Sequence, residues 1–143
     1  MLFGTLTHPP LLSALARAGH GSKILISDGN YPHSTGAPAS AERIFLNLAP
    51  GLLSVDDVLG VLTKSVPLEA AEVMLPPDGV EVPAIVGYRE MLPGVSFSGH
   101  DRFGFYEAAR HPDVAIVIAT GDQRVYANLL LTIGVRQPED TTP

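Results

Sequence analysis

The sequence contains no cysteine and no tryptophan among its 143 residues, and only 17% of its residues are charged. The lack of cysteine excludes a disulfide framework, a thiolate nucleophile and every metal site built on cysteine. A chain of this length buries roughly 70% of its unfolded surface around one core, so neither disulfides nor a metal are needed for folding. Ordinary soluble domains carry roughly 25% charged residues. We therefore expect other protein, most simply further copies of this chain, to cover part of the surface.

Basic residues are also scarce, since 9 Lys and Arg stand against 15 Asp and Glu, giving a formal net charge of −6. Nucleic-acid binding needs clustered cations, and here the arginines are spread from Arg17 to Arg136, so we expect no nucleic-acid partner. No apolar run reaches the roughly 18 to 20 residues of a membrane span. The N-terminus shows neither the basic nor the apolar region of a signal peptide. The sequence thus indicates a cytoplasmic protein without membrane contact.

Short apolar segments alternate with helical patterns along the chain. Proline, Ser54 as an N-cap and glycine stops predict helices, and apolar runs between turn residues predict strands. The predicted helices cover residues 9–19, 55–62, 83–91 and 102–110, and the predicted strands cover residues 23–28, 43–48, 72–75, 95–98 and 114–119. The apolar segment 128–133 is too short to assign from its periodicity alone.

This alternation predicts a single α/β domain of three layers, in which a largely parallel or mixed sheet is covered by helices on both faces. The domain is expected over residues 1–136, with residues 137–143 as a flexible tail. The loop 29–40 is long and rich in turn residues. Loops of this length in compact domains are commonly functional or disordered, so residues near it are candidates for a site.

Two candidates flank the first predicted strand. His20 lies between two glycines, so its imidazole has room to face a cleft and to exchange a proton near neutral pH. The alternative is that His20 simply follows the carboxyl end of the preceding helix and interacts with its dipole. Asp28 ends the strand and either binds a ligand hydroxyl or caps the turn at Gly29.

Two further candidates lie in the second half of the chain. Arg102 precedes three aromatic residues within positions 103–106 and offers a rigid fork of donors beside a stacking wall, although Phe105 also suits the core. Tyr126, Ala127 and Asn128 follow the turn around Gly121. The phenol and the amide suit recognition of hydroxyl groups, and capping of the loop is the alternative. No local spacing typical of metal ligands connects His20, His33 and His100, so we expect no metal.

Together these motifs resemble the D-ribose pyranase and L-fucose mutarotase family of sugar mutarotases. The matching stretches are residues 19–21, 27–32, 102–107 and 121–135, in the order and spacing of the family. The resemblance implies a cofactor-independent isomerase that binds a monosaccharide and assembles as a decamer of paired pentameric rings, with sites near subunit contacts.

The resemblance also implies roles for individual residues. His20 matches the proposed general acid, Asp28 matches a sugar-binding carboxylate, and Tyr126, Ala127 and Asn128 match a tripeptide that contacts the sugar. Arg102 matches an arginine of the fucose branch. Ala127 is more similar to the ribose branch, and Gly29 stands where the family commonly has alanine. The chain is therefore placed nearer the L-fucose mutarotases, with the sugar itself left open.

The chemistry implied is the exchange of anomers through ring opening and closing. One group protonates the ring oxygen while another takes the proton of the anomeric hydroxyl, so an acid and a base suffice without a redox cofactor or metal. We assign the first role to His20, sugar binding to Asp28 and Arg102, and assistance at the anomeric hydroxyl to Tyr126. The alternative is a sugar-binding or transport-associated accessory protein that uses the same pocket without catalysis.

Overall fold

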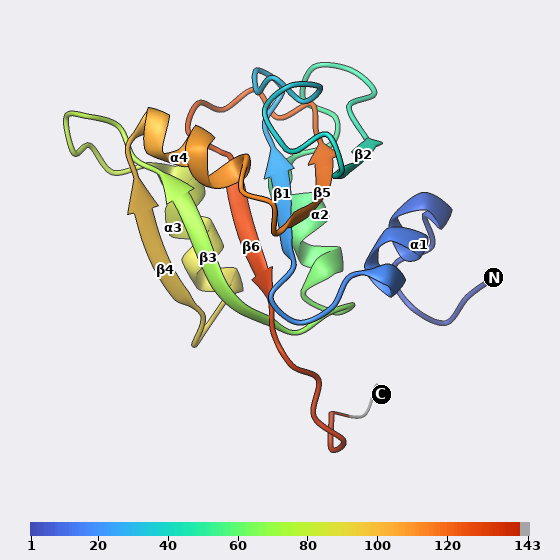
Figure 1. Cartoon of the computed structure of the whole chain (residues 1–143). Coiled ribbons are helices and arrows are strands. Elements are labelled where there is room, and N and C mark those ends of the chain that lie inside the picture. The colour runs from blue at the N-terminus through green and yellow to red at the C-terminus, as the bar shows by residue number, and fades with distance from the viewer. Residues whose placement is uncertain (141–143) are drawn as a thin grey trace.

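The computed structural model describes residues 1–140 and contains one six-stranded sheet with four helices (Figure 1). The helices are α1 (Pro9–Arg17), α2 (Val55–Leu62), α3 (Pro83–Met91) and α4 (Arg102–Ala109), and the strands are β1 (Lys23–Ser27), β2 (Glu42–Phe45), β3 (Leu68–Met74), β4 (Ser96–His100), β5 (Val114–Ala119) and β6 (Leu129–Ile133). None of the helices within residues 1–140 is long and apolar enough to cross a bilayer.

The strands follow the order β2-β5-β1-β6-β3-β4 across the sheet. β1 and β2 run parallel to β5, and β3 runs parallel to β4. β6 lies between β1 and β3 and runs antiparallel to both. The five other strands therefore share one direction, which confirms the prediction of a mixed, mostly parallel sheet.

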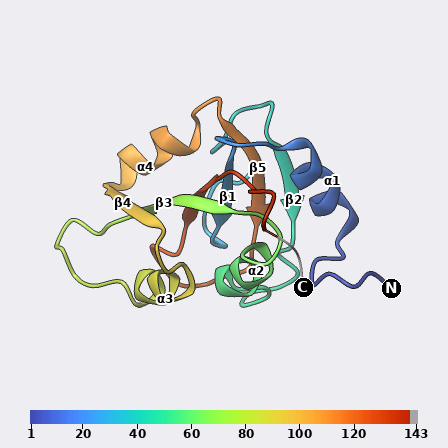
Figure 2. The ribbon, with the colours of Figure 1, turned by 90° about the horizontal axis from the view of Figure 1, so that it is seen from below.

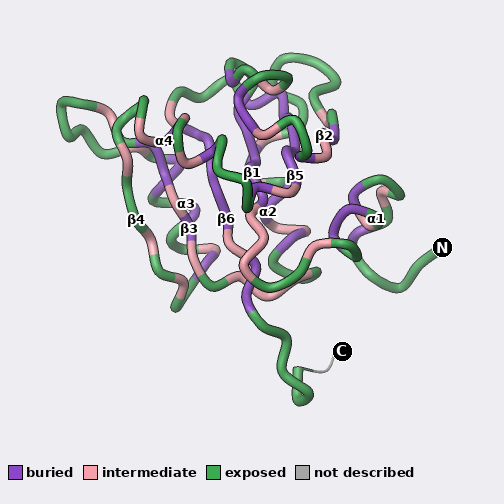
Figure 3. Tube along the Cα trace, in the orientation of Figure 1, coloured by how far each residue is buried: buried purple, intermediate pink, exposed green. Residues whose placement is uncertain are grey.

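Helices cover both faces of the sheet, as Figure 2 shows with α2 and α3 on one side and α4 on the other. Ile24 and Ile26 of β1 join the apolar cluster under α2 and α3, whereas Leu25 joins the cluster under α4. The loop after β1 completes the α4 side through Tyr31. A strand buried on both faces reads as a mostly apolar run, so the three apolar residues 24–26 of β1 follow from its central place in the sheet. Figure 3 colours most of β1 as buried. The three-layer prediction is confirmed.

Local sequence signals set the helix starts. The Ser54 hydroxyl accepts a hydrogen bond from Asp57 N at 3.1 Å, and the Asp57 carboxylate accepts one from Ser54 N at 3.0 Å. This capping box satisfies donors that the first turn of α2 leaves unpaired. Pro83 occupies the first position of α3, where no N–H is needed.

Strand boundaries differ more from the sequence-based expectations. β3 begins at Leu68, four residues before the predicted start, and the unassigned segment 128–133 forms β6. Both depend on antiparallel pairing between β3 and β6, a contact between distant segments that local periodicity does not report. Of the predicted tail, residues 137–140 form a turn in which Gln137 N donates to the Asp140 carboxylate at 2.7 Å, and residues 141–143 lie outside the described residues. The boundary at residue 136 stays a prediction.

Candidate active site

The sheet brings most of the predicted site residues to one edge. Because five strands share a direction, their carboxyl ends meet at the same edge, together with the start of antiparallel β6. Asp28 follows β1, Arg102 begins α4 just after β4, and residues 126–128 precede β6. In parallel sheets, ligands bind at this edge. The structure therefore places Asp28, Arg102 and the tripeptide 126–128 where the sequence predicted a site.

Asp28 is fixed on both sides by hydrogen bonds. Its backbone N–H donates to Asn128 Oδ1 at 2.8 Å, and its carboxylate accepts from Asn30 N at 3.0 Å. Burial raises the pKa of the Asp28 carboxyl, and the nearby Asp122 carboxylate acts in the same direction. The residue therefore does cap the turn, as one of the two interpretations held. Its raised pKa is typical of carboxyls that exchange protons in active sites.

The segment before β6 is held in an unusual conformation. Tyr126 has a φ of 58°, a left-handed geometry that costs a non-glycine residue about 1 kcal/mol or more and is concentrated at functional sites. The buried Tyr88 hydroxyl donates to Ala127 O at 2.7 Å. Asn128 lies one residue further and contacts Asp28. These bonds present the Tyr126 phenol from a rigid support.

Aromatic side chains border the site on the α4 side. The rings of Tyr31 and Tyr106 lie 5.6 Å apart at 61°, and Arg102 Nε donates to the Tyr106 hydroxyl at 3.3 Å. This hydrogen bond and the Tyr106 charge, with a smaller contribution from Tyr126, raise the pKa of Arg102. Phe105 is fully buried, so its assignment to the core is confirmed. Tyr31 was not assigned a role from sequence, although its place in the long loop was the available signal.

Asp122 anchors the loop between β5 and β6. Its carboxylate accepts from Val55 N at 3.0 Å and from the Arg124 guanidinium at 2.7 and 3.0 Å. Burial alone would raise the pKa of Asp122, but the bonds from Arg124 and Val55 outweigh it and lower the pKa. The carboxylate therefore joins this loop to the first turn of α2.

His20 lies at the opposite edge of the sheet. Gly21 N donates to Ile133 O at 2.9 Å, which ties this turn to the end of β6. His20 Nε2 lies 3.2 Å from both carboxylate oxygens of Glu69. All five residues of β1 separate His20 from Asp28, a length of roughly 17 Å at about 3.3 Å per residue. Within one chain, the structure does not bring His20 together with the other site residues.

A second charged cluster lies on the α4 side of the sheet and was not found from sequence. The Glu72 carboxylate accepts a hydrogen bond from Lys23 Nζ at 2.9 Å and forms another with His100 Nε2 at 2.9 Å. Burial by itself would raise the pKa of Glu72, but the bonds from Lys23 and His100 outweigh it and lower the pKa. In the sequence, His100 lies 28 residues from Glu72 and Lys23 lies 49 residues from it. No local spacing therefore reveals the cluster.

Comparisons with known proteins find similar sequences over more than nine-tenths of the chain. Fucose mutarotase from Bos taurus is 37% identical, covering 94% of this chain and 93% of that protein. D-ribose pyranase from Paracidovorax citrulli is 32% identical, covering 91% of this chain and 95% of that protein.

Solved structures give the same result. RbsD of Bacillus subtilis complexed with D-ribose superposes with a TM-score of 0.82 at 26% identity, covering 96% of this chain and 99% of that chain. The fucose mutarotase in complex with L-fucose from Streptococcus pneumoniae superposes with a TM-score of 0.77 at 28% identity, covering 91% and 94%. The resemblance found from the motifs is thereby confirmed. Since the model of the RbsD / FucU transport protein family also matches residues 1–136, the chain belongs to that family.

Proposed function

We propose that the protein is a sugar mutarotase that interconverts the anomers of a monosaccharide such as L-fucose by acid-base opening and closing of the ring. The observation that carries this proposal is the meeting of Asp28, Arg102, Tyr126 and Asn128 at one edge of the sheet. Relatives named fucose mutarotase and D-ribose pyranase align over nine-tenths of the chain, which supports the same reaction class here.

The groups at this edge match the requirements of the reaction. The Asn128 carbonyl accepts from Asp28 N, which leaves the amide NH₂ to donate to a sugar hydroxyl. Arg102, an exposed cation beside Tyr106, binds a second hydroxyl. Ring opening transfers one proton to the ring oxygen and removes one from the anomeric hydroxyl, beside which we place the Tyr126 phenol. The aldehyde then rotates and closes, so proton transfer worth about 10² to 10⁴-fold is the catalysis required.

The general acid assigned to His20 must then come from another copy of the chain. His20 is about 17 Å from Asp28 along β1, a separation that strand geometry fixes. We infer a homo-oligomer in which the His20 and Glu69 pair of one copy meets the Asp28 edge of the next. Glu69 contacts His20 Nε2 and so orients the ring, which leaves Nδ1 for the sugar ring oxygen.

Exposed apolar side chains beside the site support this assembly. Phe103, next to Arg102, is 76% exposed, and Val125, next to Tyr126, is 68% exposed. A contact with another copy would cover these two side chains, and the low charge content of the chain agrees with such a contact. The decameric stoichiometry, the identity of the sugar and the cytoplasmic location stay predictions.

Saturation-transfer NMR between the anomers of L-fucose and of D-ribose tests the function. We expect the wild-type protein to accelerate exchange for one of these sugars and His20→Ala to remove most of the acceleration. Gln137→Ala removes an exposed amide that is not among the assigned site residues and should retain the acceleration. Sugar binding by calorimetry without any acceleration would overturn the enzymatic proposal and favour an accessory binding protein. A His20→Ala protein as fast as wild type would overturn the role of His20.

A further inference from the structure

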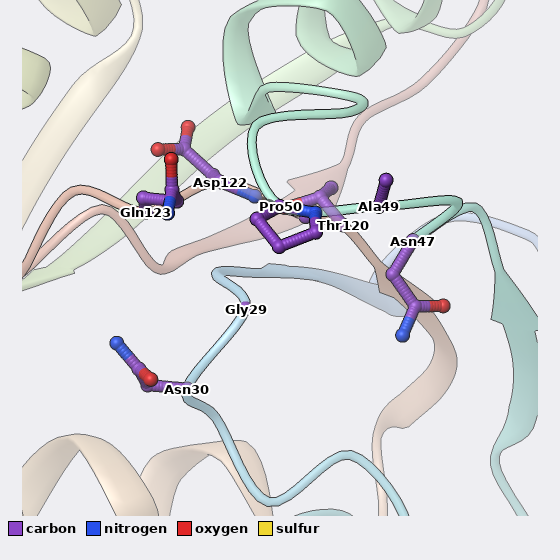
Figure 4. A pocket seen from close by; sticks show the side chains of 9 residues that line it. Gly29, Asn30, Asn47, Ala49, Pro50, Thr120, Asp122 and Gln123 are labelled. Carbon is purple, nitrogen blue, oxygen red and sulfur yellow. Dashed lines mark hydrogen bonds between the residues drawn. The ribbon is translucent and has the colours of Figure 1, made fainter.

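A separate pocket of about 380 Å³ lies at the same edge of the sheet, above β1, β5 and β2 (Figure 4). Its lining includes three side-chain amides, of Asn30, Asn47 and Gln123, and the small apolar surface of Ala49 and Pro50. Small-molecule pockets commonly span roughly 300 to 1,000 Å³, so this pocket has the size of a ligand site. None of the residues assigned above to the sugar belongs to its lining.

The topology explains why a pocket forms there. Each of three neighbouring parallel strands supplies part of it, since Asn30 follows β1, Asn47 follows β2 and Gln123 follows β5. The connection after β1 packs on the α4 side of the sheet, whereas the connection after β2 leads into α2 on the other side. Where the connections of nearby parallel strands diverge in this way, a crevice opens at their carboxyl ends and binds ligands.

Backbone hydrogen bonds fix the shape of this pocket. Gly29 N donates to Asp122 O at 2.8 Å, and Gly51 N donates to Gly121 O at 2.6 Å. A Cβ atom on Gly121 would collide with the carbonyl oxygens of Ala49 and Leu52, so only glycine allows the loops to approach this closely. A pocket held by backbone contacts is already formed before a ligand arrives, which reduces the cost of binding.

The lining selects a neutral ligand with many hydroxyl groups. The carboxylate in the lining, Asp122, is already engaged by Arg124 and by Val55 N. Within residues 1–140, the lining of the pocket contains neither a cationic side chain that would bind a phosphate nor an aromatic ring that would stack on a base. Asn30 is attached to Asp28 through its backbone N–H, so its side chain is left for the pocket. Amides donate and accept together, as hydroxyl groups do.

We propose that this pocket binds a second molecule of a neutral monosaccharide, separate from the molecule that reacts between Asp28 and Tyr126. The choice of a monosaccharide rests on the proposed function, whereas the pocket itself does not. The Gly29 and Asn30 segment borders both positions, since the Asn30 N–H holds the Asp28 carboxylate.

Equilibrium dialysis of the full-length protein with radiolabelled L-fucose counts the bound molecules. We expect about two equivalents per chain for wild type, and about one for the double variant Asn47→Ala/Gln123→Ala with anomer exchange unchanged. Ala49→Phe, which fills the pocket from a different residue, should also leave one equivalent. Gln137→Ala removes an exposed amide outside the pocket and should retain two.

The outcomes separate this proposal from the proposed function. A wild-type protein that exchanges anomers but binds one equivalent overturns the second site and leaves the mutarotase intact. Two equivalents without anomer exchange support the second site and overturn the mutarotase. If wild type binds two and both folded pocket variants also bind two, the second molecule lies elsewhere and the proposal is wrong.

Discussion

Replacing Asp122 tests whether one buried carboxylate holds the loop that carries Tyr126 and Asn128. Asp122 is 3% exposed and accepts from Val55 N, which is itself fully buried. In Asp122→Ala, the Val55 N–H loses its acceptor away from water, at a cost of about 1 to 3 kcal/mol. Arg124 also loses one of its two carboxylate partners, but its side chain is 41% exposed, so that loss amounts to about 1 kcal/mol. We expect a total destabilisation of about 2 to 4 kcal/mol.

Two further variants separate these contributions. Asp122→Asn keeps an oxygen for Val55 N, but it removes the charge and puts an NH₂ group where Oδ1 accepts from Arg124 N and Nε, so it should cost about 1 to 2 kcal/mol. Asp56→Asn removes the other carboxylate that contacts Arg124, at 2.9 Å on the surface, and should cost at most about 0.5 kcal/mol. The free energy of unfolding is measured by urea titration at one protein concentration, because subunit association would otherwise shift it.

The pH dependence has a defined sign. Because the pKa of Asp122 is lowered in the folded chain, its contribution is complete above its ordinary value of 3.8 and is lost as the pH falls through the folded-state pKa. The difference between wild type and Asp122→Asn should therefore persist at pH 7 and shrink below about pH 4. Asp122→Ala as mild as Asp56→Asn would refute the anchoring role.

Three other substitutions test neighbouring parts of the account. Tyr88→Phe removes the hydroxyl that donates to Ala127 O; it should destabilise by about 1 kcal/mol and slow anomer exchange, and an unchanged rate would contradict positioning of the tripeptide. Glu72→Gln should lower the free energy of unfolding by about 1 kcal/mol at pH 7, with the two urea curves converging as the pH falls below about 4 because the wild-type pKa is lowered. Arg102→Ala should reduce kcat/KM about tenfold with unchanged stability, since one charge-assisted hydrogen bond to the sugar is lost.

Local signals predicted much of the fold. The proline at the start of α3 and the six apolar residues of β5 give boundaries that agree residue for residue with the structure. The meeting of Asp28 with residues 126–128 followed from their places beside strands and from the family resemblance. Strand order was beyond local patterns, so β6 was not assigned and the start of β3 was placed too late.

The separation of His20 from Asp28 was already contained in the sequence prediction, because the two residues flank the same predicted strand and a strand places its two ends at opposite edges of the sheet. The Glu72 cluster was missed because its partners come together only through the pairing of β3 with β4 and through the central place of β1. Long-range pairing therefore decides which charged residues meet.

The central claim is that each site takes His20 from one copy and Asp28 from another, and mixed assemblies of two inactive variants test it most directly. His20→Ala and Asp28→Asn are coexpressed in equal amounts, and anomer exchange of the purified assembly is measured by saturation-transfer NMR. With random mixing in a symmetric assembly, about one quarter of the sites receive both intact residues, so we predict about one quarter of the wild-type rate. No chain in the mixture carries both intact residues. A mixture as inactive as the separate variants would contradict the shared site.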